Sequence, residues 1–132
     1  MVDLLQIRAV LLVGAGGALG AMARYGLSGL IARLWPVTFP LATLLVNSIG
    51  SLAMGVFVGL MARFLPAWQN EARLFVAIGI LGGFTTFSSF SLDAVVLIER
   101  GALVQAAAYM LLSVVLCLIG LYLGLLATRG VA

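Results

Sequence analysis

The sequence predicts an all-α membrane protein, a single domain (residues 1–132) of four transmembrane helices. Hydrophobic residues make up 64% of the chain and charged residues only 8%, too few to give a soluble domain its polar shell. The charged residues stand between four long apolar stretches. Each stretch reaches the length of about 20 residues that a helix needs to cross the hydrocarbon core. We therefore expect lipid to be the solvent of this chain.

Charged residues and helix breakers limit the predicted spans, which we place at roughly residues 9–32, 40–62, 74–98 and 102–127. Proline, tryptophan and polar residues occur in the first two connections, WPVTFP (35–40) and LPAWQNEAR (65–73). This composition is typical of turns at a membrane interface.

The third span is expected to be broken near its middle, around residues 82–86. Gly79, Gly82 and Gly83 lower helical stability there, and β-branched and hydroxyl residues follow in GGFTTFSSFSLD (82–93). A broken helix is tolerated at membrane depth only where it is buried in protein or lines a cavity. The pattern therefore favours a functional site in the third span.

The arginines are divided almost evenly between the two ends of the predicted bundle. Because the number of spans is even, both termini lie on one side, together with Arg8, Arg63, Arg73 and Arg129. The opposite side has Arg24, Arg33 and Arg100. Orientation follows the Lys and Arg bias of short loops, and this bias is nearly absent. We infer dual topology, which permits an antiparallel homodimer; the alternative is that such small counts carry no information.

Small residues recur at a spacing of four in three of the spans. This spacing lets helix backbones approach closely, either within a subunit or between subunits. The pairs are Gly16 and Gly20, Gly55 and Gly59, and Gly120 and Gly124.

Polar residues line one face of the second span and one face of the fourth. Thr43, Asn47 and Ser51 recur at intervals of four, as do Tyr109, Ser113 and Cys117. The Asn47 amide needs partners in lipid, so it serves either as a bond between helices or as part of a site. Arg24, late in the first span, either belongs to such a site or extends its side chain to a lipid headgroup.

Phe87 and Phe90 fall on nearly the same face of the third span, flanked by hydroxyl residues. The edge of a phenyl ring is electropositive, so two such edges can face a dehydrated anion. Ordinary packing or lipid contact is the competing interpretation. Asp93 is the only acidic residue near the interior of a span, which argues against a proton-coupled exporter of cations. Amide, hydroxyl and aromatic groups suit a small anion that is held loosely.

Several function classes are disfavoured by composition. The chain has no histidine and one cysteine, so it offers neither an internal disulfide nor a thiol metal cluster. Its arginines form no run, which argues against nucleic acid as a partner. No nucleophile and base pair is evident, so we do not expect an enzyme.

These residues resemble those of the Fluc-type (CrcB-like) fluoride channels over the whole chain. The resemblance lies in three motifs in order: GGALGAMARYGLS (16–28), LATLLVNSIGSLAMG (41–55) and GILGGFTTFSSFS (79–91). It implies a passive, fluoride-selective channel that exports the anion from the cytoplasm and gives fluoride resistance. It also implies a multi-pass protein of the bacterial inner membrane, an antiparallel homodimer with dual topology and two pores.

The resemblance also assigns roles to individual positions. Asn47 matches the pore asparagine, and Phe87 and Phe90 match the facing phenylalanines. A central structural Na⁺ is implied on the backbone carbonyls of Gly82 and Thr85. The remaining pore or structural positions are Arg24, Thr43, Asp93, Tyr109, Ser113 and Cys117, with Asp93 standing where Glu is common and Cys117 where a hydroxyl is common.

Two other hypotheses remain at this stage. A small multidrug-resistance-type exporter also has four spans, but the first span here lacks an embedded Glu. A non-transporting assembly subunit would use Asn47 and the serines only to join helices.

Overall fold

A computed structural model describes residues 3–129, and within this range the secondary structure is entirely helical. Four segments are long and apolar enough to cross a membrane, which confirms the predicted all-α class and the number of spans. The elements are α1 (Leu4–Leu34), α2 (Leu41–Phe64), α3 (Gln69–Ala72), the π-helix η1 (Arg73–Leu81), α4 (Gly82–Phe84), α5 (Phe87–Glu99) and α6 (Leu103–Arg129). The segments from α3 to α5 together form the third span, Gln69–Glu99.

The first helix starts well before the apolar stretch that predicted it. Asp3 caps α1: its Oδ1 accepts from the Leu5 N–H at 3.5 Å, and the Gln6 side chain accepts from the Asp3 N–H at 3.4 Å. These bonds satisfy two of the amides that a helix start leaves unpaired. Charge marks where the apolar stretch ends, whereas the cap decides where the helix begins, so Arg8 lies inside α1.

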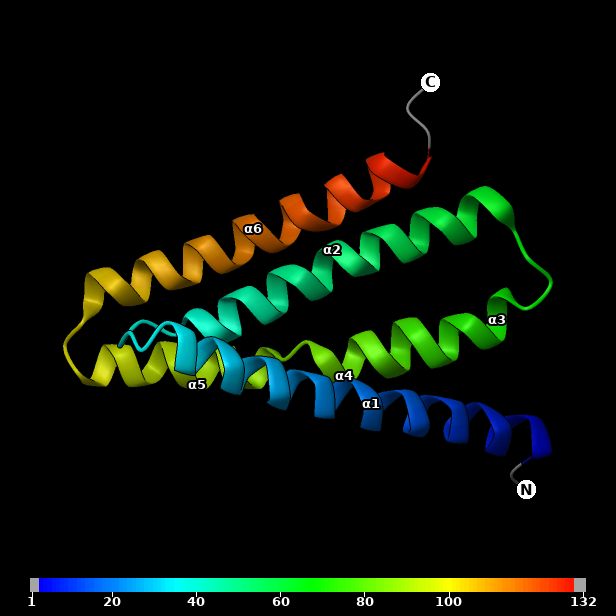
Figure 1. Cartoon of the computed structure of the whole chain (residues 1–132), viewed down its shortest axis with the longest axis horizontal. Coiled ribbons are helices and arrows are strands. Elements are labelled where there is room, and N and C mark those ends of the chain that lie inside the picture. Colours follow the sequence, from blue (N-terminus) through cyan, green and yellow to red (C-terminus); the bar gives the residue numbers. More distant parts are fainter. Residues whose placement is uncertain (1–2, 130–132) are drawn as a thin grey trace.

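The helices form two close pairs, visible in Figure 1 as α2 beside α6 and α1 beside the third span. Glycine makes both contacts possible. A Cβ on Gly16 or Gly20 would collide with backbone atoms of η1, and one on Gly55 or Gly124 would collide with the facing helix of the α2–α6 pair. The glycine spacings found in the sequence therefore serve packing within one subunit.

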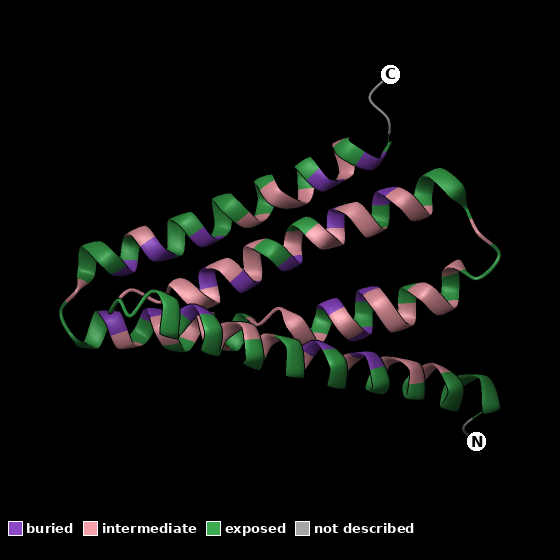
Figure 2. Cartoon of the chain, in the orientation of Figure 1, coloured by how far each residue is buried: buried purple, intermediate pink, exposed green. Residues whose placement is uncertain are grey.

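The two pairs meet at one end and diverge toward the end that holds both termini (Figure 1). The buried core is small and lies at the closed end, where Leu97, Ala106 and Tyr109 pack with Phe39 and Phe90. Outward faces are mostly exposed (Figure 2), and only 11–28% of each membrane window is buried. Because these exposed faces are apolar, they suit lipid or another protein chain.

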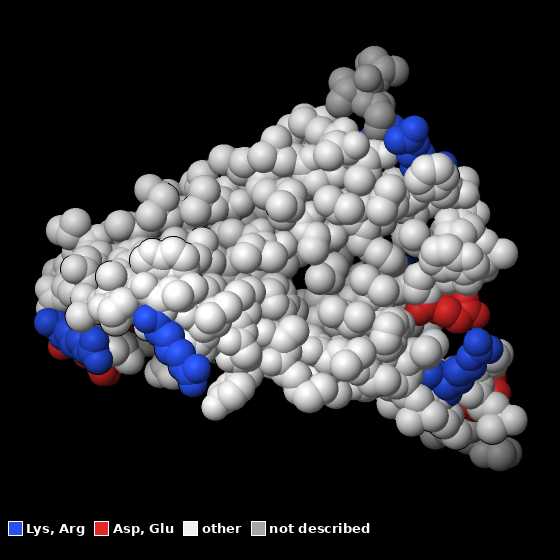
Figure 3. All heavy atoms as spheres, viewed as in Figure 1, with Lys and Arg blue, Asp and Glu red and all other residues white. Residues whose placement is uncertain are grey.

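Charged side chains gather at the two ends of the bundle and leave its middle uncharged in this view (Figure 3). At the terminal end, Arg8 approaches Glu71 to 3.9 Å, with both side chains substantially exposed. Such an exposed pair adds little stability. The position of the charges at the two ends indicates that the uncharged middle of the bundle lies in the hydrocarbon core.

The third span contains two residues with extended backbone at mid-length. Thr85 has φ −86° and ψ 154°, and Thr86 has φ −150° and ψ 117°. Thr86 caps α5, since its hydroxyl oxygen accepts from the Ser89 N–H at 3.1 Å. We refer to Thr85 and Thr86 as the interruption.

Glycine contacts in α1 yield a matched test of packing. We expect Gly20→Ala to lower the free energy of unfolding by about 1–3 kcal/mol, because its methyl group overpacks the α1–η1 contact. Gly29→Ala, in the same helix with no neighbour within 4 Å, should be neutral or slightly stabilising. Unfolding of the purified protein in mixed micelles measures both, and equal behaviour of the two variants would contradict this packing.

Candidate functional site

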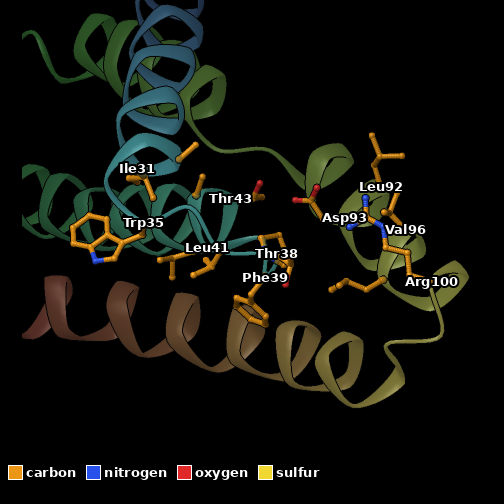
Figure 4. Close-up of a pocket in the computed structure, with 15 residues that line it drawn as sticks. Ile31, Trp35, Thr38, Phe39, Leu41, Thr43, Leu92, Asp93, Val96 and Arg100 are labelled. Atoms are coloured by element: carbon orange, nitrogen blue, oxygen red, sulfur yellow. The ribbon is translucent and has the colours of Figure 1, made fainter.

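Two hollows lie along the closed half of the bundle. The outer cavity, about 370 Å³, is bounded by the α1–α2 connection and α5 and contains Thr43, Asp93 and Arg100 among its walls. Figure 4 shows the Thr43 hydroxyl and the Asp93 carboxylate pointing toward one another across it. The central groove, about 360 Å³, is lined by Asn47, Thr85, Thr86, Phe87, Phe90, Ser113, Val114, Cys117 and Leu118.

Tyr109 lies between the two hollows and contacts a wall residue of each, Asp93 and Phe90. Its ring is fully buried, and its hydroxyl donates to Asp93 Oδ2 at 3.1 Å. The Phe90 ring meets it edge to face with centroids 5.2 Å apart, and Phe87 follows at 5.4 Å from Phe90. Phe39 contacts Tyr109 from the other side at 5.6 Å. A continuous row of aromatic rings thus runs from the outer cavity to the central groove.

Asn47 is hydrogen-bonded to the interruption twice. Its Nδ2 donates to Thr86 O at 3.0 Å, and its Oδ1 accepts from the Thr86 N–H at 2.8 Å. We call this arrangement the Asn47–Thr86 pair. It uses one of the two amide N–H donors and one acceptor position, so one N–H of Asn47 is left for another partner.

These bonds change which backbone carbonyls are free. In a continuous helix the Thr86 N–H would donate to Gly82 O and the Ser89 N–H to Thr85 O. Here the Thr86 N–H donates to Asn47 and the Ser89 N–H to the Thr86 hydroxyl. The carbonyls of Gly82 and Thr85 therefore lose their helical donors. Gly82 is exposed on the surface of the single subunit.

Ser113 places a buried hydroxyl against the central groove. The residue is only 6% exposed, and its hydroxyl is the only buried side-chain N or O atom without a hydrogen-bond partner among residues 3–129. Cys117, one helical turn further along α6, is partly buried and lines the same groove. A buried hydroxyl without a partner is energetically costly, so it marks a place where a ligand can bind.

Phe87 is 79% exposed, although it lines the groove. In one subunit the groove is thus open on the side of this ring. The edges of Phe87 and Phe90 can enclose an ion only when something else covers that side.

Arg24 lies apart from both hollows. Its Nε donates to Gly83 O at 3.1 Å, joining α1 to α4 beside the interruption. The Arg24 side chain is partly buried. Its Nε is therefore bonded within the protein and not to a lipid headgroup, which was the alternative from the sequence.

The structure adds three residues that sequence reasoning did not assign to the site. Thr86 holds Asn47, and its position as the N-cap of α5 was a readable signal. Gly50 lets α2 approach the interruption, because a Cβ there would collide with Thr85 Cγ2. Phe39 comes from a connection and becomes part of the site only through its contact with Tyr109.

Fold and site together define a class: a small, multi-pass, helical membrane protein with a polar and aromatic groove at mid-span. The chain belongs to the family described as "CrcB-like protein, Camphor Resistance (CrcB)", which matches residues 11–125. This is a family of ion channels and not of enzymes.

Similar proteins cover nearly the whole chain. One from Rhodospirillum centenum is 51% identical over 93% of this chain and 97% of its own length. One from Agrobacterium fabrum is 49% identical over 92% and 96%, and one from Erythrobacter litoralis is 44% identical over 98% of each. All three are named "Fluoride-specific ion channel FluC".

Two conservative substitutions distinguish bonded from unbonded hydroxyls in the site. Tyr109→Phe should lower the free energy of unfolding by about 1–3 kcal/mol, because the Asp93 carboxylate loses its buried donor. Ser113→Ala breaks no internal bond and should leave stability unchanged or slightly raised. Unfolding in mixed micelles measures both, and a large loss in Ser113→Ala would show that its hydroxyl has a structural partner.

Proposed function

We propose that this protein is a passive, fluoride-selective channel of the bacterial inner membrane that exports fluoride and so gives fluoride resistance. Relatives named as fluoride-specific ion channels are similar to it over 92–98% of its length. The proposal also accounts for the chemistry of the central groove, which amide, hydroxyl and aromatic groups line.

The unpartnered Ser113 hydroxyl carries this proposal. Fluoride is small and strongly hydrated, so a site that strips its water must supply fixed hydrogen-bond donors. Ser113 offers one such donor, and the free N–H of Asn47 offers another on the same groove. The edges of Phe87 and Phe90 supply weaker positive potential where no donor reaches. The hydroxyl groups of Tyr109 and Thr43 continue this series of polar side chains toward the outer cavity.

The charges support passive flow. Among residues 3–129 no carboxylate lines the central groove, and Asp93, the carboxylate that accepts from Tyr109, lies at the outer cavity. The groove therefore lacks a group for coupling anion movement to protons. Hydrogen fluoride crosses lipid and dissociates at cytoplasmic pH, so an open path for the anion is sufficient for resistance.

The same proposal makes the working unit an antiparallel homodimer with two pores, each built from both subunits. The exposed Phe87 ring and the open side of the groove support a second chain as the missing wall. The even division of arginines between the two ends supports insertion in both orientations.

A structural Na⁺ on the dimer axis completes the proposal. The residues present suit it, since Na⁺ prefers oxygen ligands and the carbonyls of Gly82 and Thr85 have lost their helical donors. In this proposal the third span works as two half-helices, and the ion raises the positive potential near the pores.

Fluoride transport is tested with proteoliposomes. Addition of a potassium ionophore should release fluoride rapidly, as followed with a fluoride electrode, while chloride release in parallel vesicles stays low. Asn47→Ala and Phe87→Ala should abolish release. Absence of fluoride release from folded dimeric protein would contradict the channel and favour an exporter or an assembly subunit.

The single cysteine, Cys117, gives a second test of the proposed fluoride path through the central groove. A small methanethiosulfonate reagent should form a mixed disulfide with Cys117 and block fluoride release, because this thiol lines the central groove. Cys117→Ser should transport fluoride and resist the reagent. Unchanged transport after complete modification would remove Cys117 from the path.

A further inference from the structure

We infer that Asn47 is a positioning residue: by forming the Asn47–Thr86 pair, its side chain holds the interruption open and keeps the Gly82 carbonyl available to a cation. This inference rests on the proposed channel, and it extends the role of Asn47 beyond donation to the anion. One amide then shapes the cation site and faces the anion groove at the same time.

The argument starts from the needs of backbone groups in lipid. An unpaired N–H or C=O at membrane depth costs several kcal/mol. Thr86 is the N-cap of α5, so its extended dihedrals take its N–H out of the helical pattern, while its C=O stands at the start of α5. Asn47 accepts from this N–H at 2.8 Å and also donates to the C=O at 3.0 Å, so its side-chain oxygen takes the place of a backbone acceptor.

The competing conformation is a continuous third span. There the Thr86 N–H would return to Gly82 O, the bond that the helical pattern requires. That bond would occupy the carbonyl and turn its dipole along the helix axis. The Asn47 side chain and the Gly82 carbonyl therefore compete for the same N–H, and in this structure Asn47 holds it.

The surroundings of Asn47 are arranged for this contact. Gly50 lies three residues further on α2, and its missing Cβ makes room for Thr85 and Phe84. From the other side, Arg24 donates to the carbonyl of Gly83, which precedes Phe84 and the interruption. The interruption is thus held from α1 and α2, while the exposed Gly82 stays uncovered within the subunit.

Three variants test the inference. Asn47→Ala removes both bonds to Thr86. Asn47→Asp keeps an oxygen that accepts from the Thr86 N–H in either protonation state. Ser48→Ala is the control, because Ser48 is also partly buried on α2 but donates only to Leu44 O of its own helix, at 2.7 Å.

The first readout is the sodium dependence of thermal stability in detergent, with N-methyl-D-glucamine chloride keeping the ionic strength constant. For Asn47→Ala we expect the sodium concentration that gives half of the stabilisation to rise by about tenfold or more, as losing both hydrogen bonds implies. Asn47→Asp should retain most of the wild-type response, and Ser48→Ala all of it. An unchanged sodium response in Asn47→Ala would overturn the inference, whereas a wild type without any response would contradict the proposed cation itself.

The second readout is structural and needs no variant to fold. In the wild type the Thr86 amide should exchange slowly with solvent deuterium in sodium and in N-methyl-D-glucamine alike, because Asn47 and not the cation holds it. Fast exchange would overturn the inference. Where Asn47→Ala folds, its structure should show the Thr86 N–H within hydrogen-bond distance, about 3 Å, of Gly82 O. An interruption that persists unchanged in that variant would also overturn the inference.

Discussion

The requirement that backbone polar groups find partners inside lipid governs the functional half of this molecule. A helix meets that requirement by itself, so any departure from helix needs a partner from elsewhere in the protein. The third span departs at Thr85 and Thr86, and Asn47 on α2 supplies the partner. Asn47 takes the donor that the Gly82 carbonyl would have in a continuous helix, and the Thr86 hydroxyl caps α5 and takes the corresponding donor of the Thr85 carbonyl.

Close packing of helices makes that contact possible. An asparagine side chain reaches a neighbouring backbone only when the helices lie near each other, and Gly50 brings α2 against the interruption. On the other face, Gly16 and Gly20 bring α1 against η1 and α4. Small residues thus act as spacers that set the distance at which the polar groups meet. The divergence of the two helix pairs toward the terminal end (Figure 1) leaves room that the proposed second subunit would share.

The all-helical fold and the number of spans were predictable because their causes are local. Apolar length and sparse charge predict four membrane helices, and the cap chemistry of Asp3 explains why α1 starts at Leu4. The i, i+4 spacing placed Asn47 on one face of α2 and Ser113 and Cys117 on one face of α6. The sequence also indicated that Asn47 needs a hydrogen-bond partner. That this partner is Thr86 depends on how α2 lies against the third span, which no local pattern encodes.

By itself the sequence determined the solvent, the number of spans, the polar faces and the family, since these follow from composition, period and motif. Only the tertiary structure decided that the glycine pairs act within the subunit, that Arg24 binds Gly83 O, and that Ser113 is left without a partner in a groove beside Phe87. These outcomes depend on distances between residues far apart in the chain. Such distances are set by how whole helices pack, and packing reflects the shapes of all contacting side chains together.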